Sequence, residues 1–338
     1  MTIAVGRIAG RFLVAIFAVG ATLLVLAGPA SADGVGPTNY QSVIDSVSPH
    51  PSGVQVQVVG EDSFLQVTAK RGTTVEIPGY DGEPYLRILR DGTVERNRNS
   101  AATFLNNSRS GRVDIPAGVN TKAEPDWEQL ATDGKIAWHD HRIHYMSSGT
   151  PTVGSDGLVQ EWMVPMTVGD HEITISGSLF HNSNVVPWAL LVTAAAIVGA
   201  ILVLRRHGQR WAMVLVVLAA GLALAISASV AWLNPPGSEA SWLPIVLPIL
   251  AIFAGLATRL VPADRQPLLR LTPPLAAVAL LIGWAVPIIG VLWMPNIPSL
   301  LPEYLVRIGF GLAIGVAIGA AVSMLAWPEP SPRTVDGG

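Results

Sequence analysis

The second half of this chain is dominated by apolar segments that are long enough to cross a membrane. A helix needs about 20 predominantly apolar residues to span the hydrocarbon core of a bilayer. Five segments of spanning length follow Pro187, at about 187–204, 211–233, 242–261, 271–293 and 305–327. We therefore expect residues 187–327 to form a bundle of five transmembrane helices in a multi-pass membrane protein.

Charged residues divide the chain into two parts. Residues 33–186 contain 11 Lys/Arg against 19 Asp/Glu, whereas residues 187–338 contain 8 against 5. The formal net charge of −3 provides no broad basic surface, which argues against a nucleic-acid partner. Cysteine is absent, so disulfides, thiolate metal sites and cysteine nucleophiles are excluded. A metal would have to be bound by His, Met or carboxylate groups.

The first 32 residues have the three parts of a secretory signal. Arg7 and Arg11 precede the apolar run 12–27, and Ala30-Ser31-Ala32 places small residues at the spacing of a cleavage site. We expect cleavage after Ala32 and export of the chain that follows. The alternative is an uncleaved N-terminal anchor, which also exports the following segment.

Basic residues predict the orientation of the helices. Two short connections are flanked by arginines: Arg205, Arg206 and Arg210 at one, and Arg259, Arg265 and Arg270 at the other. Connections 234–241 and 294–304 contain no Lys or Arg. Because cytoplasmic loops carry the excess of Lys and Arg, we expect an extracytoplasmic N-terminal domain and a cytoplasmic C-terminus in the cytoplasmic membrane. The tail 328–338, after Trp327, is expected to be disordered.

Residues 33–186 have the pattern of short β-strands. Residues 54–58 and 64–69 are strand-like runs, and residues 158–168 and 171–180 flank Gly169-Asp170 as the two strands of a hairpin would. Several such runs, separated by Gly, Pro, Asn and Asp, are typical of a β-sandwich. We expect an all-β sandwich, immunoglobulin- or cupredoxin-like, that joins the helix bundle with little linker.

The densest group of chemically active side chains lies at residues 138–146, Trp-His-Asp-His-Arg-Ile-His-Tyr-Met. Imidazole suits copper, zinc and nickel, and a thioether favours Cu(I). We therefore predict a metal site whose candidate ligands are His139, His141, His144 and Met146. Asp140 is predicted to orient an imidazole through a hydrogen bond.

Strand geometry limits this site. In a straight strand His139 and His141 share one face, whereas His144 points to the other. A turn or bulge near Arg142 is needed before all three can bind one ion; otherwise the first two must recruit a distant ligand. The alternative is a metal-free network in which the same side chains fix a loop by hydrogen bonds, and acid–base catalysis is a third reading.

Three glycines, Gly311, Gly315 and Gly319, lie four residues apart in the last apolar segment. They form one smooth face, which favours close packing of membrane helices. This face packs either within the bundle or against a second copy or a partner subunit.

Residues 138–146, together with Ile-Pro-Gly-Tyr-Asp-Gly-Glu-Pro-Tyr at 77–85, resemble a family of uncharacterised actinobacterial membrane proteins over most of the chain. That resemblance implies no activity. The architecture of an exported sandwich with a His-x-His pair on membrane helices is also similar to the copper-binding B subunit of particulate methane monooxygenase. This similarity implies copper at His139 and His141, although the expected mature N-terminus, Asp33, departs from the histidine ligand of that subunit.

The sequence thus predicts extracytoplasmic handling of a metal, with copper expected, on a platform anchored in the membrane. The alternative is a metal-free structural or partner-binding subunit of a membrane complex. A membrane-bound hydrolase ranks last, because Gly-x-Ser-x-Gly and phosphate-loop motifs are missing. The sequence therefore favours a role other than that of an enzyme.

Overall fold

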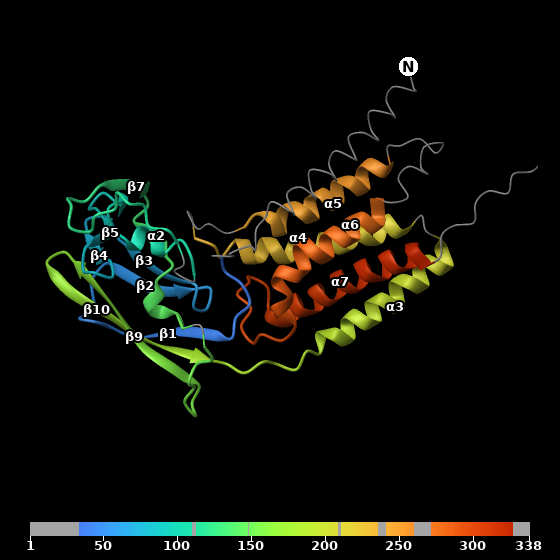
Figure 1. Ribbon diagram of the computed structural model, residues 1–338, viewed down its shortest axis with the longest axis horizontal. Coiled ribbons are helices and arrows are strands. Elements are labelled where there is room, and N and C mark those ends of the chain that lie inside the picture. The colour runs from blue at the N-terminus through green and yellow to red at the C-terminus, as the bar shows by residue number, and fades with distance from the viewer. Residues whose placement is uncertain are drawn as a thin grey trace, which may run out of the picture.

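The computed structural model describes residues 34–109, 113–147, 149–208, 211–235, 241–259 and 272–326. A β-sheet domain lies at one end of the molecule and a bundle of helices at the other (Figure 1). The expected signal peptide at 1–32 and the tail at 328–338 lie outside the described residues, as do Arg210, Arg265 and Arg270.

The β-sheet domain consists of two antiparallel sheets. Its strands are β1 (Tyr40–Ser48), β2 (Val54–Val59), β3 (Phe64–Ala69), β4 (Val75–Pro78), β5 (Pro84–Ile88), β6 (Val94–Asn97), β7 (Trp127–Ala131), β8 (Lys135–Trp138), β9 (Leu158–Val168) and β10 (His171–His181). One sheet has the order β1-β10-β9-β4-β5-β6-β7 and the other the order β2-β3-β8. The strands predicted at 54–58 and 64–69 and the predicted hairpin are confirmed.

Apolar side chains of both sheets form one core. Its most deeply buried members include Leu65, Val67, Val75, Ile77, Ile88, Val164, Met166, Ile173 and Ile175. They alternate with more exposed residues along several strands, so each strand turns its apolar side inward. Burial of this apolar surface is the main stabilising contribution. The division into seven and three strands differs from the four and three of a constant-type immunoglobulin domain.

The second half of the chain is helical. Its elements are α3 (Ala189–His207), α4 (Ala212–Ala231), α5 (Leu243–Arg259), α6 (Thr272–Ala279), the π-helical η4 (Leu280–Ala285), the 3₁₀-helical η5 (Val286–Leu292) and α7 (Glu303–Ala326). Among the described residues, four helical stretches are long and apolar enough to cross a membrane: Ala189–His207, Ala212–Ala231, Thr272–Leu292 and Glu303–Ser323. The predicted span at 242–261 forms α5, whose apolar part, Leu243–Thr258, is shorter. The count of five spans is therefore not confirmed.

The glycine face of α7 packs inside the bundle. A Cβ atom on Gly315 would lie 2.5 Å from the carbonyl oxygen of Thr193 and 2.6 Å from Cβ of Ala196, both on α3. Gly311 and Gly319 contact α3 in the same way. The absence of side chains on this face lets the two helix backbones approach closely. Within this chain, the glycine face therefore lies against α3.

Hydrogen bonds attach the sheet domain to the helix bundle. Thr38 and Asn296 form an antiparallel bridge, with N–H···O distances of 3.0 and 3.2 Å. The backbone N–H of Val35 donates to Oδ1 of Asn234, just after α4, at 2.9 Å. Both connections that lack Lys and Arg therefore touch the sheet domain, whereas the basic last turn of α3 lies at the far end of that helix.

Candidate functional site

A turn brings the predicted histidines together. β8 pairs antiparallel with β3, with Trp138 opposite Leu65, so the chain leaves β8 beside the start of β3. It then forms the 3₁₀ turn η1 (His141–Ile143), after which His144 returns toward His139. The rings of His139 and His144 stack with their centroids 4.0 Å apart, and the ring centroid of His141 lies 5.7 Å from that of His139. The bend that the sequence required near Arg142 is present.

Asp140 holds this turn in place. Its fully buried carboxylate accepts hydrogen bonds from the backbone N–H of Arg142 at 3.0 Å and from the Arg142 guanidinium at 2.6 and 2.8 Å. It also accepts one from Nε1 of Trp138 at 2.7 Å. Burial alone would raise the pKa of Asp140, but the hydrogen bonds and charge of Arg142 keep it below its ordinary value. Asp140 therefore caps the turn, and its hydrogen bonds within the described structure go to Trp138 and Arg142 rather than to an imidazole.

Residues from distant parts of the chain complete the support of the turn. The hydroxyl of Tyr80 accepts from the backbone N–H of His141 at 2.9 Å and donates to Oδ1 of Asn106. Nε2 of Gln160, on β9, donates to the carbonyl oxygen of His144 at 2.9 Å. Residues 77–85 and 138–146 thus meet at one site.

Each of the three imidazoles has one nitrogen against an oxygen acceptor. The pairs are His139 Nδ1 with the Ser63 carbonyl at 2.7 Å, His141 Nε2 with the Ser108 carbonyl at 2.8 Å and His144 Nδ1 with Asp62 Oδ2 at 3.3 Å. Carbonyl and carboxylate oxygens only accept, so the protons are assigned to these nitrogens. In a neutral ring the other nitrogen then carries no proton and has a free lone pair. These nitrogens are His139 Nε2, His141 Nδ1 and His144 Nε2.

Burial keeps two of the rings neutral. His139 is 3% exposed and His144 is 2% exposed. Burial lowers the pKa of His139 to about 2, helped by the neighbouring His144 and Arg109, and it also lowers the pKa of His144 despite the hydrogen bond to Asp62. Within the described part of the chain, neither Nε2 atom has a hydrogen-bond partner. Buried polar atoms nearly always form hydrogen bonds, so two buried nitrogens without one are unusual and are candidates for binding a ligand.

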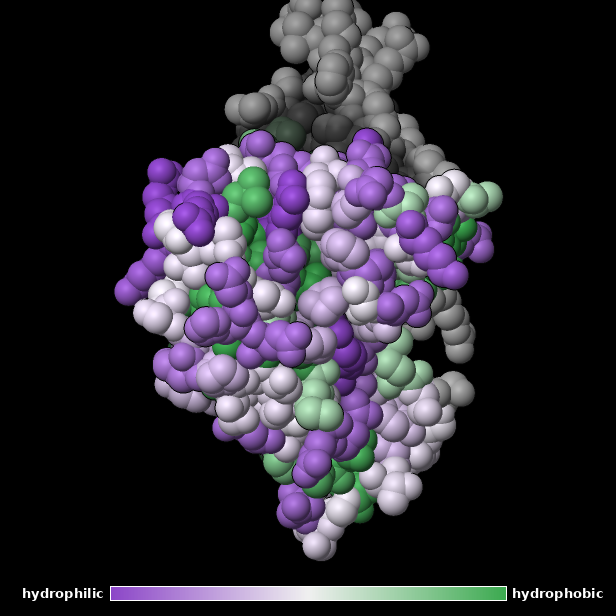
Figure 2. Space-filling model, turned by 90° about the vertical axis from the view of Figure 1, so that its left-hand side faces the viewer, coloured by the Kyte–Doolittle hydropathy of each residue, from purple (hydrophilic) through white to green (hydrophobic). Residues whose placement is uncertain are grey.

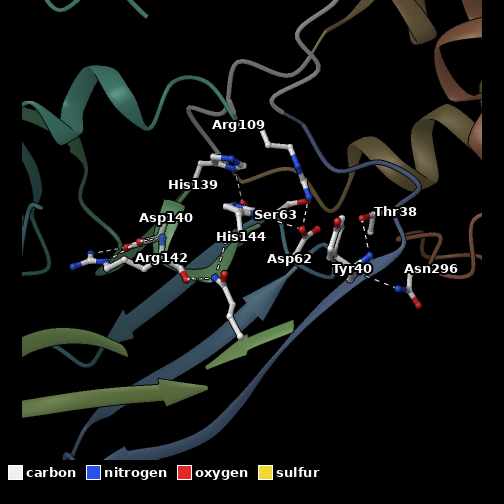
Figure 3. A network of polar contacts seen from close by, with 11 residues as sticks. Thr38, Tyr40, Asp62, Ser63, Arg109, His139, Asp140, Arg142, His144 and Asn296 are labelled. Atoms are coloured by element: carbon white, nitrogen blue, oxygen red, sulfur yellow. Dashed lines mark hydrogen bonds and ion pairs between the residues drawn. The ribbon is translucent and has the colours of Figure 1, made fainter. Parts of the chain in front are cut away.

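Asp62 is the carboxylate that holds an imidazole. It is fully buried in the turn between β2 and β3, and its Oδ2 also accepts from the guanidinium of Arg109 (Figure 3). Burial raises the pKa of Asp62, but the hydrogen bond from His144 and the charge of Arg109 outweigh it and hold that pKa below its usual range. Asp62 and Ser63 carry no signal in the sequence, where they belong to a short polar turn between two strand-like runs.

The metal hypothesis can be tested against this geometry. Across the described residues, no three His, Asp or Glu side chains are arranged as a formed metal site. A metal ion lies near the plane of each imidazole that binds it, and the stacked rings of His139 and His144 are inclined by only 27°. One ring must therefore turn before a single ion can bind both. Met146 is 40% exposed.

In comparisons with known proteins, no family model, curated protein or solved structure matches this chain. The function must therefore be argued from the site itself.

Proposed function

We propose that this protein is a membrane-anchored metal-binding protein whose histidine cluster, His139, His141 and His144, holds a metal ion outside the cytoplasm. The observation that carries the proposal is that each of the three rings places one nitrogen against an oxygen acceptor, which leaves the other nitrogen available to a metal ion. Histidines that bind metals characteristically donate their other ring N–H to a carboxylate or a backbone carbonyl. Each ring of the cluster makes such a contact, and two of the free nitrogens are buried without a partner in the described structure.

The charge of the site favours a soft, singly charged ion. The buried rings of His139 and His144 are neutral, and the carboxylate of Asp62 is already paired with the guanidinium of Arg109. A divalent ion would therefore add two buried positive charges without compensation, whereas Cu(I) would add one. Imidazole ligands suit copper. These considerations support copper as the expected metal, and Met146 is proposed as an additional soft ligand because a thioether favours Cu(I).

The distribution of arginines supports extracytoplasmic binding. The two connections without Lys or Arg contact the sheet domain, and the basic turn with Arg205 and Arg206 lies at the other end of α3. By the positive-inside rule, the sheet domain is then outside and the basic turn is cytoplasmic. The histidine cluster would lie near the outer surface of the membrane, where an anchored protein can exchange an ion with a membrane partner.

A metal-free structural or partner-binding subunit is the second candidate. It is favoured by Asp140, Arg142 and Tyr80, which all fix the turn by hydrogen bonds. A partner-binding surface is expected to expose a contiguous apolar patch. The face of the sheet domain that points away from the helices is mostly hydrophilic, with apolar side chains in small separate groups (Figure 2). This face therefore offers no large apolar patch of the kind that the alternative expects.

The test is a titration of the purified full chain in lipid nanodiscs with Cu(I), Cu(II) and Zn(II), each against a competing chelator. We expect one ion per chain, bound with a Kd below about 1 µM, and loss of binding in His139→Gln/His144→Gln. His171→Gln, at an exposed position on β10, is the matched control and should bind as the unmodified chain does. Absence of binding, or binding that ignores the double substitution, would refute the metal site and leave the subunit role.

A further inference from the structure

The two acceptors that orient the buried imidazoles lie on one turn, residues 60–63 between β2 and β3. This turn rests on the segment that precedes and begins β1. The backbone N–H of Ser42 donates to the carbonyl oxygen of Glu61 at 3.1 Å. The side chain of Val35 packs so closely against Gly60 that a Cβ atom there would lie 2.7 Å from it. The position of the turn therefore depends on the position of this segment.

The same segment is bonded to the membrane half of the chain. Nδ2 of Asn296 donates to the carbonyl oxygen of Tyr40 at 3.1 Å, and the backbone bridge between Asn296 and Thr38 lies beside it (Figure 3). The ring of Tyr40 stacks on that of Tyr145, with centroids 5.9 Å apart and an interplanar angle of 18°. Tyr145 directly follows His144. The start of β1 thus touches both the residue that follows His144 and the helix bundle.

A buried arginine holds Asn296 in place. Arg307, near the start of α7, is 1% exposed. Its guanidinium donates to the carbonyl oxygens of Val291 and Met294, at the end of the broken helix formed by α6, η4 and η5, and to Glu303 at 2.7 Å. A cation at a helix C-terminus is favourable because it compensates the partial negative charge of the last carbonyls. The connection that carries Asn296 is thereby fixed to the bundle.

We infer that the membrane helices help to build the histidine cluster, with Asn296 acting through Tyr40 and the turn 60–63 as a positioning residue for His139 and His144. Two hydrogen bonds, from the His139 and His144 Nδ1 atoms to this turn, decide which ring nitrogen remains free. Release of the segment from the bundle lets the turn shift and removes that constraint. The predicted change in metal affinity rests on the proposed function, whereas the predicted change in the positions of the ring protons does not.

The experiment measures the ring protons and the metal affinity in the same full-length protein. NMR of ¹⁵N-histidine in nanodiscs reports which nitrogen of each imidazole carries the proton. In the metal-free chain we expect the Nδ1–H form at His139 and His144. Asn296→Ala should replace it by an average of the two tautomers and should weaken Cu(I) binding about 10-fold, the effect typical of residues that hold metal ligands in place.

A matched control lies at the same junction. Asn184→Ala removes the 2.8 Å hydrogen bond from Asn39 but none of the described bonds between β1 and the helices, so tautomers and affinity should both stay unchanged. If Asn296→Ala unfolds the chain, Asn296→Asp serves instead, because it keeps the size and the backbone bridge but places a carboxylate oxygen, which cannot donate, against the carbonyl oxygen of Tyr40.

The outcomes separate the two proposals. Unchanged tautomers in a folded Asn296 variant would overturn the positioning role, whether or not the chain binds a metal. Altered tautomers in a chain that binds no metal would support the positioning role and refute the proposed function. An equal effect of Asn184→Ala would also overturn the inference, since it would show a general loosening of the junction.

Discussion

Substitution of Gly315 by alanine should weaken the contact between α3 and α7. The added Cβ atom would lie 2.5 Å from the carbonyl oxygen of Thr193 and 2.6 Å from Cβ of Ala196. Both distances are far below van der Waals contact, and neither neighbour is the end of a flexible side chain that can rotate away. The helices would have to move apart along their interface.

The size of the effect follows from two opposing contributions. Overpacking of a close interface costs about 1–3 kcal/mol, whereas replacement of glycine by alanine within a helix gains up to about 1 kcal/mol. We expect a net loss of about 1–2 kcal/mol in the free energy of unfolding. Gly199→Ala on α3 is the matched control, because a Cβ atom there meets nothing within 4 Å, and it should be neutral or stabilising.

The assay is denaturant unfolding of the full chain in detergent, followed by far-UV circular dichroism, with the oligomeric state measured by size-exclusion chromatography with light scattering. Stability should decrease from Gly199→Ala and the unmodified chain to Gly315→Ala, with no change in oligomeric state. Equal stability of Gly315→Ala and the unmodified chain would refute close packing at this position. Dissociation of an oligomer without loss of stability would show that the glycine face binds a second copy.

Three further predictions concern buried charged and titratable groups. In the metal-free protein, the lowered pKa values of His139 and His144 mean that the unfolded chain binds more protons than the folded chain below about pH 6.5. The free energy of unfolding should therefore be highest above that pH and decrease below it. It should fall by up to about 1.4 kcal/mol per histidine in total between pH 7.5 and 5.5, and the same fall in a variant without both rings would exclude this origin. Asp62→Asn should weaken metal binding about 10- to 100-fold in the chelator titration, and an unchanged Kd would show that this carboxylate does not support His144. Arg307→Ala leaves two carbonyls without their donor and should cost about 3 kcal/mol in thermal unfolding, with partial recovery in Arg307→Lys; a neutral Arg307→Ala would refute its anchoring role.

The amino-acid sequence by itself determined the layout of this protein. Apolar length predicted the helical second half, because a bilayer demands long uninterrupted apolar segments. Alternation at 54–58 and the hairpin pattern around Gly169 predicted strands, because side chains of a strand point to opposite faces in turn. The histidine motif predicted where chemistry concentrates and that a turn or bulge near Arg142 was needed for its histidines to meet. These are local properties, and each is contained in a short window of residues.

Tertiary structure decided which groups face the histidines. Ser63 is 76 residues from His139, and Asn296 is 256 residues from Tyr40. Their contacts depend on which strands pair, in which register, and on how the sheet domain docks on the helices. Those choices minimise the free energy of the whole chain, so no short window encodes them. For the same reason Asp140, which stands between two histidines in the sequence, forms hydrogen bonds with Arg142 in the folded chain. The carboxylate that contacts the imidazole of His144 is that of Asp62.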